Sequence, residues 1–202
     1  MKIENKDKII LDLCGGTGAW SKPYKDAGYD VRVITWPEYD VKTFTPPENV
    51  YGILAAPPCT MFSMARTVAK TPRDMKTAME VVNACLRIVR ECQQDGKRLQ
   101  FWALENPKAR LRWFLGKPPL TMNPYDYGDR VRKPTDIWGY FNEPKKNPVE
   151  LTEEEKVKFG SHVELLPKLP EGYTGYQCSN KRAAMRAITP PMWAKAFYDA
   201  NH

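Results

Sequence analysis

Histidine is almost missing from this chain, and the close spacings by which cysteine and histidine hold metals are missing altogether. The 202 residues contain two histidines and five cysteines, with no CxxC pair. Zinc sites and disulfide frameworks are therefore both disfavoured. No stretch approaches the roughly 18 apolar residues of a membrane-spanning helix, and residues 1–6 lack the apolar core of a signal peptide. We expect a cytoplasmic protein with no metal and no membrane partner.

The residues that are present indicate one globular domain with an appendage. A chain of 202 residues can bury one sizeable core but is too short for two domains of ordinary size. The net charge is +7 with a pI near 9.1, which suits a polyanionic partner such as nucleic acid. Charge alone leaves that partner undecided, because many basic proteins bind no nucleic acid.

Apolar runs alternate with helical patterns along the first two thirds of the chain. Strands are predicted at 8–13, 31–35, 51–56, 99–104 and 136–141, and helices at 21–27, 72–96, 152–159 and 189–201. Ser21 and Thr71 are the expected caps of the first two helices. Cys85 and Cys92 belong to the apolar stripe of the second helix and are expected in the core. This order predicts an α/β fold with a mostly parallel sheet and helices on both faces.

A glycine-rich turn follows the first predicted strand. Residues 14–18 read Cys-Gly-Gly-Thr-Gly, and N–H groups at such a turn bind nucleotide-like cofactors. A tight structural turn explains the glycines equally well, and their bunching differs from the GxGxxG of nicotinamide-binding folds. Trp36, Glu38 and Asp40 follow the second strand and are candidate contacts to ribose and base. The alternative for them is a surface turn.

Two prolines lead the chain out of the third predicted strand to Cys59. They stiffen the backbone and force an extended exit, which would hold the thiol at the rim of the sheet. A nucleophilic cysteine has to be an accessible thiolate, and nearby N–H groups or Arg66 would favour that form. The alternative is an inert buried thiol after a proline turn.

Glu105 closes the next predicted strand. A carboxyl at one strand end and a cysteine at another supply the acid and the nucleophile needed to attack an electron-poor ring. The alternative role of Glu105 is a loop cap before Asn106. The carboxyl ends of parallel strands share one edge of a sheet, so we expect the glycine turn, Trp36, Cys59 and Glu105 to gather there.

These segments resemble motifs of the cytosine-5 DNA methyltransferases. DLCGGTGAWS (12–21), PPCTMFS (57–63) and ENP (105–107) are similar, in order, to the first, fourth and sixth motifs. GDRVRKPTDIWG (128–139) is similar to the arginine-bearing eighth motif, and RAITPPMWAKAF (186–197) to the tenth. The compact arrangement is similar to the small methylases of bacteriophages, which implies a bacterial or phage-infected cell and roles such as restriction-modification.

The resemblance covers residues 8–141 and 183–200 and implies a Rossmann-like S-adenosylmethionine-dependent methyltransferase fold. It divides the chain into a catalytic core at 1–141, a loop-rich target-recognition insert at 142–182 and a carboxyl-terminal helix at 183–202 that packs back on the core. The insert is very small for this family. A short recognition sequence, loose specificity, or help from a second copy or another subunit would follow.

The resemblance also assigns roles in catalysis. Cys59 would add to carbon 6 of cytosine, and Glu105 would hold and protonate ring nitrogen 3. Addition turns carbon 5 into an enamine that accepts the methyl group of S-adenosylmethionine, and the base has to be flipped out of the duplex first. For the family's catalytic arginine the preferred residue is Arg132, then Arg130, with Lys133 third.

The implied cofactor is S-adenosyl-L-methionine. Trp36 would stack on its adenine, Asp40 would contact the adenine amino group, and Pro58 would line the pocket beside the methyl group. The full implied cofactor site comprises Asp12, Leu13, Cys14, Gly15, Gly16, Thr17, Gly18, Trp20, Trp36, Asp40, Val41, Pro57, Pro58 and Thr189. Double-stranded DNA would contact Ser63, Arg66, Lys133, Lys181 and Arg182.

Two departures from the family pattern stand out. The family usually has Phe at the position of Cys14, whose expected role is packing against the cofactor. It also usually has an Asn in the closing motif, where residues 187–189 offer only Thr189.

Three other functions fit parts of the sequence. An RNA (tRNA) methyltransferase would use the same Cys59 and Glu105, and the positive charge serves either substrate. A nicotinamide-dependent oxidoreductase is disfavoured by the glycine spacing. A decayed methylase that only binds DNA is disfavoured because the cysteine, the glutamate and the glycine turn are all present.

Overall fold

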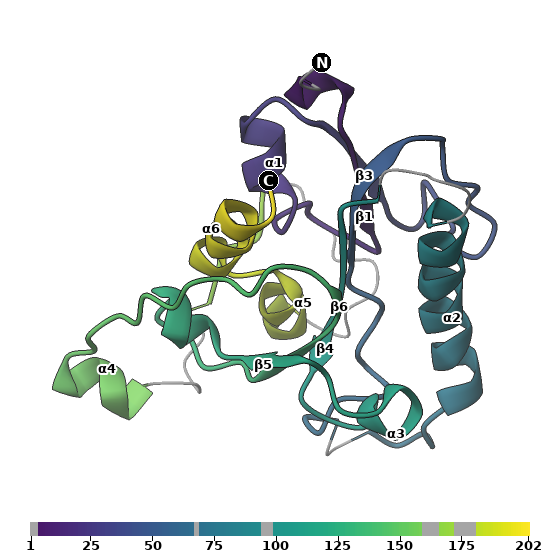
Figure 1. Cartoon of the computed structure of the whole chain (residues 1–202). Helices are drawn as coiled ribbons and strands as arrows, with labels where there is room; N and C mark the ends of the chain where they lie inside the picture. Colours follow the sequence, from purple (N-terminus) through teal and green to yellow (C-terminus); the bar gives the residue numbers. More distant parts are fainter. Residues whose placement is uncertain (1–3, 67–68, 94–98, 159–165, 172–180) are drawn as a thin grey trace.

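The computed structural model describes residues 4–66, 69–93, 99–158, 166–171 and 181–202. A six-stranded sheet of order β2-β1-β3-β4-β6-β5 runs through the described part of the chain (Figure 1). Its strands are β1 (Ile9–Leu13), β2 (Asp30–Ile34), β3 (Val50–Ala55), β4 (Phe101–Pro107), β5 (Leu120–Met122) and β6 (Thr135–Tyr140).

The sheet is mixed rather than uniformly parallel. β1 pairs in parallel with β2 and β3, and β3 pairs in parallel with β4. β6 is antiparallel to both β4 and β5, so it alone runs in the opposite direction. The expectation of an α/β fold is confirmed, with this correction to the parallel pattern. The short strand β5 carries too few residues to give a recognisable period and was not expected.

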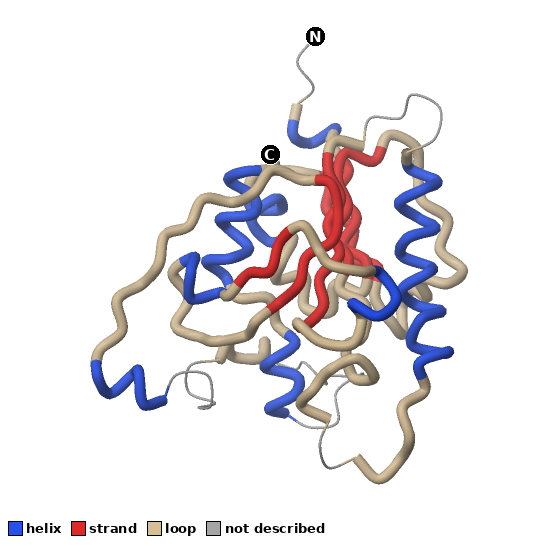
Figure 2. Tube along the Cα trace, turned by 60° about the horizontal axis from the view of Figure 1, so that its bottom comes forward, coloured by secondary structure: helices blue, strands red, loops and turns tan. Residues whose placement is uncertain are grey.

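Helices cover both faces of the sheet (Figures 1 and 2). Helix α2 (Met75–Cys92) lies on one face, whereas α1 (Lys22–Asp26) and α6 (Pro191–Ala200) lie on the other. The remaining described helices are α3 (Arg112–Leu115), α4 (Glu153–Lys158), α5 (Lys181–Ala187) and the 3-10 turns η1 (Asn5–Asp7) and η2 (Pro124–Tyr127). None of the helices in the described ranges has both the length and the apolarity needed to cross a membrane.

The period-two alternation of the strands divides the core into two clusters. On the α2 face, Leu11, Leu13 and Ile53 pack with Val82 and Cys85. On the opposite face, the cluster is largely aromatic and includes Tyr24, Phe101, Trp193 and Phe197. Cys85 and Cys92 are both buried, as the sequence predicts. Each Å² of apolar surface removed from water contributes about 25 cal/mol to the free energy of unfolding. These two clusters are therefore the main source of stability.

Of the two predicted helix caps, Thr71 is wrong, whereas Ser21 stands at the predicted cap position of α1 without bonding through its side chain. Helix α2 starts at Met75 with Asp74 as its cap, because the Asp74 side chain accepts a hydrogen bond from the N–H of Thr77 at 3.0 Å. Thr71 lies before that start. Ser21 precedes α1 but does not cap it through its side chain, because its hydroxyl donates to Asp12 instead. Helix α2 ends at Cys92, and Gly96, its predicted end, lies outside the described residues.

Candidate active site

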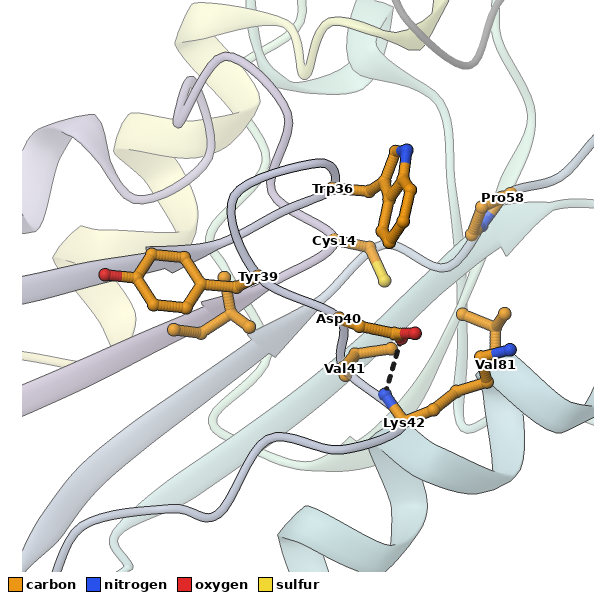
Figure 3. Close-up of a pocket in the computed structure, with 9 residues that line it drawn as sticks. Cys14, Trp36, Tyr39, Asp40, Val41, Lys42, Pro58 and Val81 are labelled. Carbon is orange, nitrogen blue, oxygen red and sulfur yellow. Dashed lines mark hydrogen bonds between the residues drawn. The ribbon is translucent and has the colours of Figure 1, made fainter.

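A pocket opens at the carboxyl ends of the first three strands. It has a volume of about 310 Å³. Cys14 follows β1, Trp36 follows β2 and Pro58 follows β3, and all three line this pocket (Figure 3). The chain order reverses between β1 and β3, and such a switch point is where open α/β sheets bind ligands. The structure therefore gathers the glycine turn, Trp36 and the diproline exit at one edge, as predicted.

Five of the predicted cofactor residues line this pocket. They are Cys14, Trp36, Asp40, Val41 and Pro58. Sequence reasoning missed the other four lining residues, which are Ile34, Tyr39, Lys42 and Val81. Val81 comes from helix α2, far away in the sequence, so no local pattern indicates it.

Trp36 presents a ring to the pocket rather than to the core. Its side chain is 55% exposed, and Figure 3 shows it standing between Cys14 and Pro58. An aromatic ring left this open at a pocket mouth is suited to stack on a flat heterocycle. Asp40 lies across the pocket, where one carboxylate oxygen accepts a hydrogen bond from the Lys42 N–H at 2.9 Å. That carboxylate retains further acceptor sites for a ligand amino group.

Cys14 lines the pocket, and the buried thiol of Cys85 lies against it in the core. Cys14 has a positive φ of 56° and its N–H donates to the carbonyl of Ile34 at 2.7 Å. A side-chain hydrogen bond with Cys14, and burial, raise the pKa of the Cys85 thiol well above its usual range. Both effects keep Cys85 neutral, so it acts as part of the core beneath the pocket.

The glycine turn closes over the carboxyl group of Asp12. A Cβ at Gly15 would lie 2.4 Å from Cγ of Asp12, so no side chain fits there. Gly16 and Gly18 have φ of 56° and 69°, which L-residues rarely adopt. Thr17 between them is half-buried. The glycines are thus required by the geometry of this turn itself.

Asp12 is a fully buried acid that the fold does not satisfy. One oxygen accepts a hydrogen bond from the Ser21 hydroxyl at 2.6 Å, whereas Oδ1 has no partner among the described residues. Burial raises the pKa of this carboxyl to about 6, although the bonds from Ser21 oppose the shift. Such unsatisfied buried acids are uncommon outside functional sites.

We expect Asp12→Asn to stabilise the protein above pH 6. Because the pKa of Asp12 is about 6 in the folded protein, above the usual 3.8, the folded state retains a proton that the unfolded chain releases. Stability therefore falls as pH rises from about 4 to about 6, and the loss persists above that window. The neutral amide removes this loss, which is on the order of 2–3 kcal/mol at pH 8. Urea unfolding at pH 5 and pH 8 measures it.

The exposed Asp26, which pairs with Lys22 on the surface, offers a matched control. Asp26→Asn is expected to change stability little at either pH. If Asp12→Asn were less stable at pH 8 than the unaltered protein, the carboxylate would be a stabilising contact and the account of Asp12 would be wrong.

Trp20 lies away from the pocket. Its side chain is 2% exposed and meets Phe197 edge-on at 5.4 Å, within the aromatic cluster beneath α6. Its Nε1 has no partner among the described residues. Leu13 and Pro57 are also buried and do not line the pocket. Their place is under the site rather than at its surface.

The strand register brings the segment before Cys59 beside Glu105. Ala55 at the end of β3 pairs with Leu104, and β4 then continues to Pro107, so Glu105 lies within this strand, paired with Ile137 of β6, rather than after its end as predicted. Nδ2 of Asn106 then donates to the carbonyl of Pro57 at 3.0 Å, which joins the diproline exit to the residue after Glu105. Asn106 was read only as part of the ENP motif, and the sequence carries no signal for this bond.

Cys59 and Glu105 are both half-buried at this edge. The carbonyl of Cys59 accepts hydrogen bonds from Phe62 and Ser63, which curls the following loop into a turn. Oε2 of Glu105 is enclosed and has no partner among the described residues. A carboxyl in this state is available to hydrogen-bond a ligand that enters beside it.

The basic cluster, which consists of Arg130, Arg132 and Lys133, lies just before β6 at the same edge of the sheet. The carbonyl of Pro134 accepts from the Lys108 N–H at 2.9 Å, which places the start of β6 beside the end of β4. Arg130 pairs with Glu155 of α4. Arg132 is exposed and has no ion pair within the described ranges, whereas Lys133 is half-buried. The structure therefore leaves Arg132, the preferred candidate, as the available guanidinium.

Helix α6 is attached to the segment before the basic cluster by the buried Asp129. Asp129 accepts hydrogen bonds from the N–H groups of Met192 and Trp193, at 3.2 and 2.9 Å, and so caps α6. Burial raises the pKa of Asp129, against those two bonds. Thr189 is half-buried just before this helix and does not line the pocket. Sequence reasoning missed the Asp129 cap because donor and acceptor are far apart in the chain.

Only some of the predicted DNA-contacting residues lie within the part of the chain that the structure describes. Ser63 accepts the N–H of Ala65 at 3.1 Å, and Arg66 donates to Thr71 at 2.8 Å, both in the loop after Cys59. The side chains of Lys181 and Arg182 lie outside the described part of the chain, as do residues 159–165 and 172–180 of the expected recognition insert.

Comparison of the chain with protein-family models and with curated proteins finds no match in either. Within the described ranges no group of three or more His, Cys, Asp or Glu is placed to hold a metal ion.

Proposed function

We propose that this protein is a DNA cytosine-5 methyltransferase of Rossmann-like fold that uses S-adenosyl-L-methionine. The observation that carries the proposal is the junction at residues 58 and 59: Pro58 lines the pocket, and the next residue is Cys59. The Asn106–Pro57 bond holds Glu105 to the same junction. A cofactor pocket, a thiol and an acid thus adjoin one another, as base methylation through a covalent adduct requires.

The pocket residues suit the adenosine part of the cofactor. The walls supplied by Ile34, Val41 and Val81 are apolar, Trp36 offers a ring face, and Asp40 offers an acceptor. The methionine part would lie toward the glycine turn, where the unsatisfied Asp12 is found. When bound, S-adenosylmethionine supplies a methyl group on a positively charged sulfur, which an activated carbon accepts.

The chain's own residues would activate the base. Carbon 5 of cytosine is too weak a nucleophile to accept a methyl group unaided. Addition of the Cys59 thiolate to carbon 6, with Glu105 holding and protonating nitrogen 3, moves electron density to carbon 5. After methylation, a base takes the proton from carbon 5, Cys59 leaves as the thiolate, and nitrogen 3 returns its proton to Glu105, which restores the ring. Arg132 would stabilise the charge that develops on the base.

Target recognition is proposed for the insert over 142–182. The proposal is supported by helix α4, which the Arg130–Glu155 pair connects to the basic residues that precede β6. The insert is short, and a second copy of the chain or another subunit would extend it.

Transfer of tritium from labelled S-adenosylmethionine tests the substrate. We expect label in duplex DNA and none in total tRNA, because the proposal assigns a DNA base to the site. Label in tRNA only would replace the proposal with an RNA methyltransferase. Thermal stabilisation by a nicotinamide cofactor, but not by S-adenosylmethionine, would indicate an oxidoreductase. DNA binding without any transfer would indicate a decayed methylase.

A further inference from the structure

A basic and aromatic surface lies beside the Cys59 loop and shares only Arg66 with the DNA contacts predicted above. We call it the α3 surface and define it by Met64, Arg66, Arg73, Arg110 and Trp113. Trp113 is 72% exposed and Met64 is 61% exposed, which is unusual for side chains of this size and apolarity. In Figure 1, α3 lies at the same end of the sheet as the start of α2.

Direct contacts attach α3 to the Cys59 loop. The Arg110 N–H donates to the carbonyl of Phe62 at 3.3 Å, and Nη1 of Arg110 lies 3.1 Å from the sulfur of Met64. The Arg110 guanidinium lies over the Trp113 ring at 5.4 Å. Trp113 and the loop that presents the proposed nucleophile therefore form one continuous surface.

Three guanidinium groups on this surface have no acidic partner within the described ranges. Arg73 donates to the carbonyl of Ser63 at 2.9 Å, and Arg66 donates to Thr71. Desolvation, followed by the proximity of Arg110 and Arg66, lowers the pKa of Arg73. The three like charges repel one another, and an anion among them would relieve that repulsion.

The surrounding charge selects a polyanion over an apolar partner. Residues 60–76 and 105–119 together contain eight Lys or Arg and two Asp or Glu. Of these, only Arg112 is neutralised by an acid among the described residues, the buried Asp136. A second copy of this basic chain would bring like charge against like charge.

We infer that the α3 surface is a second nucleic-acid contact, in which Trp113 stacks on a base and Arg66, Arg73 and Arg110 bind neighbouring phosphates. Aromatic rings beside arginines are the means by which proteins hold unpaired or splayed bases. The inference rests on the proposed function, because the surface adjoins the edge where a flipped cytosine would be held. It also supplies contacts that the small recognition insert lacks.

Trp113→Ala should weaken binding of a fluorescein-labelled oligonucleotide, measured by anisotropy. Loss of one stacked base corresponds to a rise in Kd of about 5- to 100-fold. Trp113→Phe keeps a ring and should recover most of the affinity. Arg110→Gln should lower the slope of log K against log salt by about 0.9 for a duplex, as expected for one lost phosphate contact.

Tyr140→Ala is the matched control. Tyr140 is 71% exposed, and it pairs with Trp102 near the amino end of β4, at the opposite edge of the sheet. Tyr140→Ala should bind the oligonucleotide with the same Kd as the unaltered protein. Binding of S-adenosylmethionine, measured by calorimetry, should be unchanged in Trp113→Ala.

The outcomes separate the two proposals. If the protein transfers methyl groups and Trp113→Ala has the same Kd for the oligonucleotide and the same KM for DNA as the unaltered protein, the inference about the α3 surface is overturned and the proposed function stands. If oligonucleotide binding depends on Trp113 but no methyl transfer occurs, the inference stands and the proposed function is overturned. Sedimentation showing a dimer that Trp113→Ala dissolves, with oligonucleotide binding unaffected, would assign the surface to a second copy instead.

Discussion

Replacement of Cys59 by alanine is expected to abolish methyl transfer and to prevent a covalent protein–DNA adduct. With 5-fluorocytosine in the duplex, the atom at carbon 5 cannot leave as a proton, so the reaction stops after methyl transfer with the thiol still attached. The unaltered protein should then form a complex that resists denaturation. Loss of the nucleophile should lower the rate by at least about 10⁴-fold.

The structure explains why Cys59→Ala should abolish the reaction without disturbing the fold or cofactor binding. Cys59 is half-buried after two prolines, and the register of β3 with β4 sets the path of the exit, so alanine should leave the loop in place. Cofactor affinity should therefore be retained. Electrophoresis under denaturing conditions detects the adduct, and calorimetry detects cofactor binding.

Cys92→Ala is the control for this experiment. Cys92 is buried in the core at the far end of α2 from the site, and its loss should leave the adduct intact. An adduct that persists in Cys59→Ala and disappears with another cysteine would show that the nucleophile has been wrongly assigned.

Replacement of Glu105 by glutamine is expected to lower the rate of methyl transfer by about 10²- to 10⁴-fold. An amide fills the same space but cannot deliver a proton to nitrogen 3. A loss of rate of about 10²- to 10⁴-fold is usual when a positioned acid is removed. Oε2 of Glu105 has no partner among the described residues, so the fold should not suffer from the change. Single-turnover transfer of tritium measures the rate.

Glu105→Asp separates position from chemistry. It keeps the acid but withdraws it by one methylene, so we expect partial activity between the unaltered protein and Glu105→Gln. If Glu105→Gln transferred methyl groups at the original rate with an unchanged pH profile, Glu105 would be a structural residue within β4. The proposed mechanism would then lose its acid.

The sequence alone determined the central strands and the side chains that follow them. Buried runs such as 8–13 and 51–56 are short, apolar and bounded by glycine or proline, and local signals of this kind do not depend on the rest of the chain. The rule that parallel strands share one carboxyl edge then placed Cys14, Trp36 and Pro58 together, and all three line the pocket.

Only the tertiary structure decided which side chains meet across large separations in the chain. Neither the Asn106–Pro57 bond nor the Asp129 cap of α6 has a local signature. The motif resemblance assigns Trp20 to the cofactor site, and the tertiary structure packs its ring in the aromatic core against Phe197. Burial and long-range pairing are properties of the packed chain, because each depends on elements that the sequence pattern treats one at a time.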